Sequence, residues 1–265
     1  DAYNNVNNSG VVISSNATTG FTALNSTTAN FTNTTSGVYS IASTDAGTGV
    51  TNSTTISVTP NAVAQIIVSP ALSILLAGYS QSFTAVGTDA FGNVNNTGLA
   101  WSSNASSGFT PVDATNSDFT NTTVGFYSIT STEAGTGVPS TSYVNVTADS
   151  ISRIDLTPVD SSIVAGVNQS FTAIGYDAFN NVNSTGISFS SNGSINSTGY
   201  FDSTASGAYS VSATDAGTGA VNSTTILVTA DAVVRIDLTP QASSIVAGVN
   251  QSFTATGYDA WNNVN

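Results

Sequence analysis

A nineteen-residue stretch recurs along the chain and decides how the chain can be organised. It reads AGVNQSFTAIGYDAFNNVN at 165–183 and AGVNQSFTATGYDAWNNVN at 247–265, with a looser copy, AGYSQSFTAVGTDAFGNVN, at 77–95. The chain also opens partway into the same stretch, with DAYNNVN at 1–7. Successive copies start 88 and 82 residues apart (77 to 165, then 165 to 247). This spacing is far longer than that of solenoid repeats and is close to one immunoglobulin-sized domain.

Further markers recur in the same order and set the boundaries of the repeats. The motif GVVISSN (10–16) returns as GLAWSSN (98–104) and GISFSSN (186–192), and GVYSI (37–41) returns as GFYSI (125–129) and GAYSV (207–211). We therefore expect complete domains at 61–147 and 148–229, a partial domain at 1–60 that lacks its first two strands, and the first strands of a further domain at 230–265. These four segments are called the first, second, third and fourth repeats, numbered from the N-terminus.

Apolar residues alternate with polar ones over short stretches of each repeat. RIDLT at 153–157 places Ile154 and Leu156 on one face, and Pro158 closes the strand. The third repeat is expected to hold further strands at 162–164, 169–176, 187–190, 199–201, 208–213 and 225–229. About seven short strands with frequent turn signals predict an all-β fold of tandem Ig-like antiparallel β-sandwich domains, about seven strands each.

Composition excludes several classes of function. Charged residues make up only 6% of the chain, Arg153 and Arg235 are the only cations, and the net charge is −13. Nucleic-acid binding needs clustered Lys and Arg, so we expect no nucleic-acid partner, and an anionic membrane surface is disfavoured for the same reason. No apolar run approaches the ~18–20 residues that a membrane span needs. Without Cys the chain has no disulfide framework.

Catalytic chemistry has no candidate residues in this sequence. His and Cys are both absent, so the commonest general base and the most reactive nucleophile are missing. A pair of carboxylates could in principle hydrolyse a glycosidic bond, but most of the acids recur with the repeat and are better interpreted as structural. We expect no enzyme, no catalytic residues and no cofactor.

The strongest signal beyond the fold is the N-x-[ST] pattern of N-glycosylation acceptors. Glycans would shield a surface that few charges protect, so we expect heavy N-glycosylation. Sixteen positions match: Asn7, Asn16, Asn25, Asn30, Asn33, Asn52, Asn95, Asn104, Asn121, Asn145, Asn168, Asn183, Asn192, Asn196, Asn222 and Asn250.

Two sets of recurring acids have two interpretations each. One set follows the strand of the nineteen-residue stretch, and the other lies in the TDAGTG-type turns. Each side chain either caps its turn or contributes hard oxygen ligands to Ca²⁺. The capped turn is favoured, because the spacing matches no known calcium loop. The residues are Asp89, Asp177 and Asp259 in the first set, and Asp45, Glu133 and Asp215 in the second.

Aromatic and ionic side chains also recur at fixed positions. Ile13, Trp101 and Phe189 are equivalent, as are Tyr39, Tyr127 and Tyr209. Packing in the sandwich core is favoured over a sugar-binding platform, because these positions have inward parity. Arg153 and Asp155 lie two residues apart on an outward face, like Arg235 and Asp237, and we expect local ion pairs there.

The recurring motifs resemble bacterial immunoglobulin-like domains of the invasin and intimin type. The matching residues are I-x-L-x-P at Ile154–Pro158, AGVNQSFTA at Ala165–Ala173, D-A-x-G-N at Asp89–Asn93, Trp101, and G-x-Y-S-I at Gly125–Ile129. The resemblance covers the whole chain and implies rigid spacers or adhesive modules of cell-surface proteins. The richness in Ser, Thr and Asn is similar to that of archaeal surface-layer and filament proteins.

One position departs from this resemblance. The glycine of the D-A-x-G-N pattern is present as Gly92, but the other copies carry Asn4, Asn180 and Asn262 at that place. The low proportion of charged residues, 6% of the chain, is a second departure.

The phase of the repeats suggests a structural function at the cell surface. The fourth repeat offers the strands that the first repeat lacks, so a copy placed in front would complete the first repeat of the next copy. We expect a head-to-tail array forming an extracellular filament or cell-surface stalk. Two mechanisms fit: a window of a longer covalent chain, which continuity of the repeat favours, or separate subunits joined by donor-strand complementation.

A second class of function is also consistent with the repeats. They would equally extend a cell-surface adhesin whose binding tip lies outside this segment. That alternative implies cell-surface or host glycans as partners, whereas the filament implies further copies of the same chain.

Overall fold

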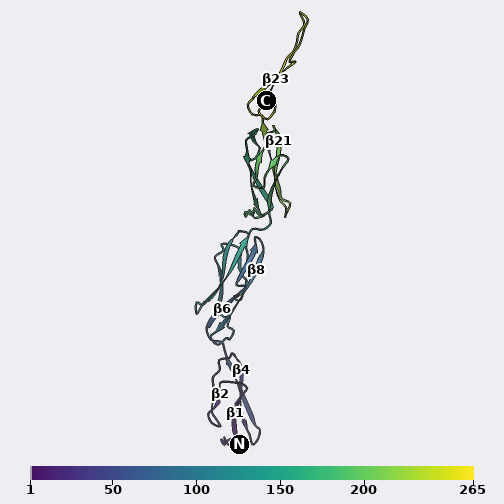
Figure 1. The fold of residues 1–265 in the computed structure, drawn as a ribbon. Coiled ribbons are helices and arrows are strands. Elements are labelled where there is room, and N and C mark those ends of the chain that lie inside the picture. The colour runs from purple at the N-terminus through teal and green to yellow at the C-terminus, as the bar shows by residue number, and fades with distance from the viewer. Residues whose placement is uncertain (1) are drawn as a thin grey trace. The chain divides into compact units, whose positions relative to one another are not determined.

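The computed structural model describes residues 2–265 and builds that range from β-strands, with no helix (Figure 1). The chain forms two compact units. The first comprises the residues up to Leu75 with Tyr79–Asn121 and Gly125–Asn145, and the second comprises Leu76–Gly78, Thr122–Val124 and Val146–Asn265. The predicted all-β class with tandem β-sandwiches is confirmed. No helix within residues 2–265 is long and apolar enough to cross a membrane.

The first repeat has one open sheet and a small hairpin. The sheet is ordered β1-β4-β5 and the hairpin pairs β2 with β3. None of the described residues 2–60 is fully buried, so this segment does not enclose a core. The strands are β1 (Val11–Ser15), β2 (Phe21–Ala23), β3 (Ala29–Phe31), β4 (Gly37–Asp45) and β5 (Thr51–Val58).

The second repeat is a two-sheet sandwich. One sheet is ordered β10-β11-β8-β6 and the other β7-β13-β12-β9. Phe83, Phe119, Ile129 and Val144 lie between them and are 0% exposed. The strands are β6 (Val63–Ser69), β7 (Leu72–Leu76), β8 (Ser80–Asp89), β9 (Leu99–Ser103), β10 (Phe109–Pro111), β11 (Asn116–Thr120), β12 (Gly125–Glu133) and β13 (Pro139–Thr147).

The third repeat has the same architecture. One layer pairs β14 with β17 and orders β16-β20-β19, and the other is ordered β15-β22-β21-β18. β15 runs parallel to β22, while the other registered pairs of this repeat are antiparallel. The strands are β14 (Arg153–Thr157), β15 (Ser161–Val164), β16 (Gln169–Ser170), β17 (Thr172–Tyr176), β18 (Ile187–Ser191), β19 (Ser194–Ile195), β20 (Tyr200–Asp202), β21 (Gly207–Asp215) and β22 (Val221–Thr229).

The alternation of apolar residues sets which side chains face the core. Ile154 and Leu156, which were expected to share one face, lie in one buried cluster together with Phe171, Ile226 and Val228. Successive side chains of a strand point to opposite faces. The sequence pattern of β14 and β22 is therefore enough to tell which of their residues face the core. This part of the prediction is confirmed.

One predicted strand is divided in two. The stretch 169–176 forms β16 and β17, which belong to different pairings, because the Phe171 N–H donates to the Gly199 carbonyl (2.8 Å) instead of to a continuous ladder. The alternation of apolar and polar residues continues across this break, so the sequence does not show that the strand changes its pairing partner. β22 also begins at Val221, four residues before the predicted start at 225.

The fourth repeat is a hairpin of β23 (Arg235–Thr239) and β24 (Thr254–Tyr258), the yellow end of the ribbon in Figure 1. Its register pairs Arg235 with Tyr258, as β14 and β17 pair Arg153 with Tyr176. Within residues 231–265 Asp259 alone is fully buried.

Candidate interaction joints and modification sites

The turn that follows β8 is organised around the carboxylate of Asp89. Its Oδ1 accepts from the backbone N–H groups of Phe91 and Asn93, both at 2.9 Å. Its Oδ2 accepts from the Asn61 N–H (2.9 Å) and from Nδ2 of Asn93 (2.8 Å). The side-chain donor of Asn93, helped by the backbone donors, outweighs burial and lowers the pKa of Asp89 to about 2. The expected turn cap is present.

Asp177 and Asp259 form the same turn in the next two repeats. Each accepts from the N–H groups two and four residues later, from an N–H 28 residues earlier, and from an asparagine Nδ2. Burial alone would raise the pKa of either carboxyl, but these donors, led by Asn181 and Asn263, together lower both pKa values.

Calcium binding at these turns was the less favoured alternative, and it is not tested by the structure. Each carboxylate oxygen already accepts two protein hydrogen bonds, so a cation would have to replace some of those donors. Among residues 2–265 no three His, Cys, Asp or Glu side chains gather where they could hold a metal.

The acids of the TDAGTG-type turns cap those turns. Asp45 accepts from the Gly47 N–H (2.8 Å) and the Thr48 hydroxyl (3.0 Å). Glu133 and Asp215 make the corresponding bonds to Thr136 and Thr218. The backbone donor of Gly47 is the main cause of the lowered pKa of Asp45, and the threonine hydroxyls are the main cause for the other two.

Asn93 connects the Asp89 turn to the first repeat. Its Oδ1 accepts from the Ser36 N–H (2.8 Å), and its Nδ2 donates to the Thr34 carbonyl (2.8 Å) as well as to Asp89. Thr34 and Ser36 lie in the loop between β3 and β4, inside the same compact unit as Asn93. We call this arrangement of turn, amide and loop the Asp–Asn joint.

The Asp–Asn joint recurs twice within the second compact unit. Asn181 donates to the Thr122 carbonyl (2.7 Å) and accepts from the Val124 N–H (3.1 Å). Asn263 bonds in the same way to Thr204 and Ser206, both at 2.8 Å. The partners are 59 and 57 residues apart in every copy. The joint was not foreseen, although an asparagine four residues after each aspartate is its visible sequence signal.

The aromatic residues two positions after Asp177 and Asp259 also belong to the joint. A Cβ added to Gly78 would lie 2.6 Å from the ring of Phe179, and one added to Gly166 would lie 2.5 Å from the ring of Trp261. These glycines have φ of +87° and +83°, so both backbone geometry and the close aromatic contact require glycine. Phe179 and Trp261 therefore each make a contact between repeats.

The other recurring aromatics lie at the sandwich interior. Tyr39, Tyr127 and Tyr209 are half-buried and pack at 5.3–5.4 Å, centroid to centroid, against the rings of Phe31, Phe119 and Phe201. Ile13, Trp101 and Phe189 are also half-buried. These contacts match the packing interpretation and leave no stacked aromatic platform at these positions.

The predicted local ion pairs are present. Arg153 pairs with Asp155, and Arg235 lies 3.4 Å from Asp237. Each guanidinium also covers the ring of a tyrosine, Tyr176 or Tyr258, at 4.4 Å. The tyrosine contact was missed because it depends on the register of two strands, which the sequence pattern alone does not give.

The sixteen sequons differ in accessibility. Asn7, Asn16, Asn25, Asn30, Asn52, Asn104, Asn168, Asn192, Asn196 and Asn250 are exposed, whereas Asn33, Asn95, Asn145, Asn183 and Asn222 are half-buried and Asn121 is buried. Nδ2 of Asn95, Asn183 and Asn222 donates to a backbone carbonyl at 2.8–2.9 Å. The exposed ten are thus the positions most open to a glycan.

Comparisons with known proteins give information about the fold of this chain only. No family model matches the sequence, and no curated protein matches it. Extracellular cadherin domains 1–4 of protocadherin gamma B7 align over 93% of this chain and 75% of theirs, with a TM-score of 0.51 and 10% identity. Domains 1–3 of protocadherin gamma C5 align over 82% and 88%, with a TM-score of 0.50 and 8% identity.

A bacterial protein shows a weaker likeness. The Escherichia coli adhesin FdeC aligns over 83% of both chains with a TM-score of 0.48 and 18% identity. At this TM-score the similarity adds nothing to the assignment of the fold. The two protocadherins establish a tandem β-sandwich fold for this chain and nothing about its partners.

Proposed function

We propose that this chain is a structural segment of an extracellular, heavily N-glycosylated filament or cell-surface stalk built from head-to-tail Ig-like repeats. The Asp–Asn joint is the observation that carries this proposal. The same side chains attach one repeat to the next at three places, with the same two backbone partners each time. A spacer needs such a uniform attachment, whereas a binding site needs a feature that distinguishes one repeat from the others.

The surface of the chain supports the extracellular part of the proposal. Charged residues are scarce, at 6%, while ten sequon asparagines are exposed. Glycans at these positions would supply the hydration that charges provide on most soluble proteins. The fold is also that of extracellular cadherin domains, and its use here is likewise extracellular.

Native material tests the proposal directly. Immunogold labelling of intact cells with antibodies against residues 61–229 is expected to mark surface filaments or stalks. Intact mass measurement before and after deglycosylation is expected to show a large loss of mass, with glycopeptides mapping to the exposed sequons. Label confined to the cell interior would overturn the extracellular assignment, and an unchanged mass would overturn the glycosylation.

The same joint would serve the spacer of an adhesin whose binding tip lies outside this segment. The two functions differ in what the repeats do alone. In an adhesin the isolated repeats stay monomeric and a non-repeating terminal domain carries recognition. Finding such a domain in the full protein, with isolated repeats that sediment as monomers, would favour the adhesin.

A further inference from the structure

The outer face of the β7-β13-β12-β9 sheet in the second repeat carries exposed apolar side chains. Leu72 and Ile74 of β7 are 62% and 74% exposed, Phe126 of β12 is 61% exposed, and Tyr143 of β13 is 44% exposed. The rings of Phe126 and Tyr143 stack, with centroids 5.3 Å apart and planes inclined by 19°. We call these four side chains the apolar patch. Large apolar groups gathered on a protein surface indicate that something covers them.

The third repeat has the same strands without the apolar patch. The two sandwiches share their sheet order, so the fold itself does not require apolar residues at these positions. The patch is therefore a property of the second repeat. The residues that replace Leu72, Ile74, Phe126 and Tyr143 in the third repeat are small or polar, and all are exposed: Asp160, Ser162, Ala208 and Thr225.

A sequon lies on the same face as the apolar patch. Asn145 of β13 begins the sequence NVT at 145–147. Its two neighbours along the strand are valines that are 0% exposed, so Asn145 points away from the core, as does Tyr143 two residues earlier. In the third repeat Leu227 takes the place of Asn145. The sequon and the aromatic pair thus occur together in the second repeat and are absent together from the third.

The register of β12 places an aromatic ring directly beside Asn145. The hydroxyls of Thr130 on β12 and Thr141 on β13 lie 2.9 Å apart. In the antiparallel register of the corresponding strands β21 and β22, this pairing sets Phe126 opposite Asn145. Opposite residues in such a pair have Cβ atoms about 4.5–5.5 Å apart. Phe126, with Tyr143 stacked on it, is therefore an immediate neighbour of the sequon.

The strand on the other side contributes the rest of the patch. The Tyr143 N–H donates to the Ala71 carbonyl (3.1 Å). In the parallel register of the corresponding strands β15 and β22, this bond sets Leu72 beside Tyr143 and Ile74 beside Asn145. Asn145 thus lies in the middle of the apolar patch, with an aliphatic side chain on one side and an aromatic ring on the other.

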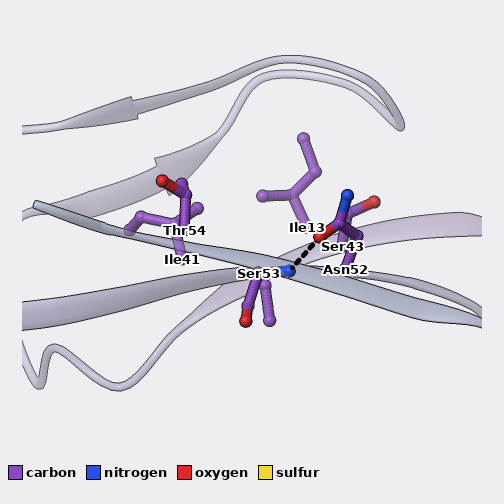
Figure 2. A pocket seen from close by; sticks show the side chains of 7 residues that line it. Ile13, Ile41, Ser43, Asn52, Ser53 and Thr54 are labelled. Carbon is purple, nitrogen blue, oxygen red and sulfur yellow. Dashed lines mark hydrogen bonds between the residues drawn. The ribbon is translucent and has the colours of Figure 1, made fainter.

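The side-chain amide of Asn145 is available for modification. It makes no hydrogen bond within residues 2–265, whereas the other half-buried sequon residues donate Nδ2 to a backbone carbonyl. Asn52, a sequon residue on β5, uses its Oδ1 to accept from the Ser53 N–H (2.9 Å), the dashed line in Figure 2. Asn145 has no such bond to give up when a sugar is attached.

We propose that Asn145 carries an N-linked glycan whose first sugar packs on the rings of Phe126 and Tyr143 and covers the apolar patch. One face of a pyranose ring presents C–H groups that can pack against an aromatic ring, while its hydroxyls stay in water. The inference rests on the proposed N-glycosylation and names the surface that one glycan occupies. A patch covered in this way needs no protein partner, which agrees with the function of a spacer.

Attachment of the sugar is a balanced exchange of bonds. A bond forms between C1 of the sugar and Nδ2 of Asn145, which loses one amide proton. The bond between C1 and the phosphate of an activated sugar phosphate breaks, and the phosphate leaves with the bonding electrons. A separate transferase supplies this donor.

Glycopeptide mapping of the native chain tests the site. Asn145 is expected to carry a glycan, in addition to the exposed sequons. Glycans on the exposed sequons with none on Asn145 would overturn this inference and leave the proposed glycosylation standing. A chain with no glycan at any position would overturn both.

Nuclear magnetic resonance tests the contact. The full chain is made in a glycosylating host, and its glycans are trimmed to one N-acetylglucosamine per site. The resonances of the sugar on Asn145, identified by their absence from Asn145→Gln, are expected to be shifted upfield by the neighbouring rings. Phe126→Ala, which copies Ala208 of the third repeat, is expected to remove this shift. A sugar with unshifted resonances in the wild-type chain contradicts the proposal.

Thermal unfolding tests whether the contact stabilises the second repeat. Asn145→Gln is compared with the wild type twice, in chains with one sugar per site and in chains made without glycosylation. The melting temperature is expected to fall only in the glycosylated pair. Leu227→Asn is the matched control, because it creates the same sequon on β22 beside small and polar side chains, and its sugar is expected to add no stability. Equal stabilisation at both positions, or none at Asn145, would overturn the inference.

Transfer of the patch provides the converse test. Ala208→Phe and Thr225→Tyr, added to Leu227→Asn, are expected to produce the upfield shift and the gain in melting temperature at the third repeat. A second copy of the chain is the alternative occupant of the patch. Sedimentation that shows a glycosylated wild-type dimer and a monomeric Ile74→Ser chain would assign the patch to that copy and overturn the proposal.

Discussion

At the scale of single residues, the Asp–Asn turn shows how two side chains both shape a loop and attach it to its neighbour. Asp89 collects four hydrogen bonds from its own turn and from Asn61, and Asn93 carries the connection onward to Thr34 and Ser36. The turn also needs one residue with positive φ. Gly92 supplies +84°, and Asn4, Asn180 and Asn262 supply 63–67°. Asparagine tolerates the left-handed region better than other residues with a side chain.

Substitution of Asn180 should separate backbone strain from side-chain chemistry. Asn180→Ala is expected to destabilise the third repeat by about 1 kcal/mol, because alanine is strained in the left-handed backbone region and has no side-chain hydrogen bond to offset that strain. Asn180→Gly, which copies Gly92, is expected to change stability by less than about 0.5 kcal/mol. Urea unfolding of both variants provides the measurement. Equal losses for Ala and Gly would show that the asparagine side chain, and not φ, matters.

The lowered pKa of Asp89 gives a signed pH dependence. A carboxyl whose folded pKa is about 2, below its ordinary 3.8, stabilises the fold fully above pH 3.8 and loses that contribution as the pH falls toward 2. Asp89→Asn is therefore expected to be less stable than the wild type at pH 6, with the difference shrinking as the pH falls toward 2. Urea midpoints for both chains across this range provide the check. A difference that stays constant with pH would contradict the assignment.

At the scale of elements, the sequence predicted most of the strands and the face that each turns toward the core. Alternation placed Ile154, Leu156 and Val228 in the core, and the recurring glycines and aspartates located the turns. It could not show where a strand changes partner, as at Phe171, because side-chain parity is the same on both sides of the break. It also could not show the far partner of Asn93, a backbone carbonyl 59 residues away, since any residue supplies a carbonyl.

Two phenylalanines in the same local sequence should respond differently to truncation. Phe171→Ala is expected to cost about 3–5 kcal/mol, because it empties a site that is 1% exposed. Phe253→Ala, in a residue that is 55% exposed, is expected to leave the unfolding of the dilute chain nearly unchanged. Thermal unfolding at low protein concentration compares them. A large effect of Phe253→Ala on the dilute chain would mean that the fourth repeat already has a core of its own.

At the scale of the whole molecule, low charge decides how copies can meet. The net charge of −13 is spread over the chain with only two cations, and both arginines pair with an aspartate two residues away. Contacts between copies in the proposed filament would therefore depend on apolar burial and backbone hydrogen bonds, with little help from opposite charges. The scarcity of charge was visible in the sequence, because composition requires no knowledge of the fold.

The salt dependence of assembly should show whether apolar burial or attraction between opposite charges holds the copies together. Screening weakens attraction between opposite charges and relieves repulsion between like ones. Raising sodium chloride from about 0.05 to 0.5 M should therefore leave assembly unchanged or strengthen it. Sedimentation velocity across this range provides the measurement. Dissociation at high salt would instead indicate an interface held by ion pairs.

The duplicated sequence SSIVAGVNQSFTA, at 161–173 and 243–255, provides an internal reference for the hydrogen exchange of the third repeat. Intrinsic amide hydrogen exchange depends on local sequence, so 161–173 and 243–255 would exchange almost alike if both were unfolded. Within one free molecule the first copy is held in strands and the second is not, so the second should exchange much faster. The ratio of the two exchange rates therefore measures the protection that the partner strands of the third repeat give to this sequence, without a label or a mutation.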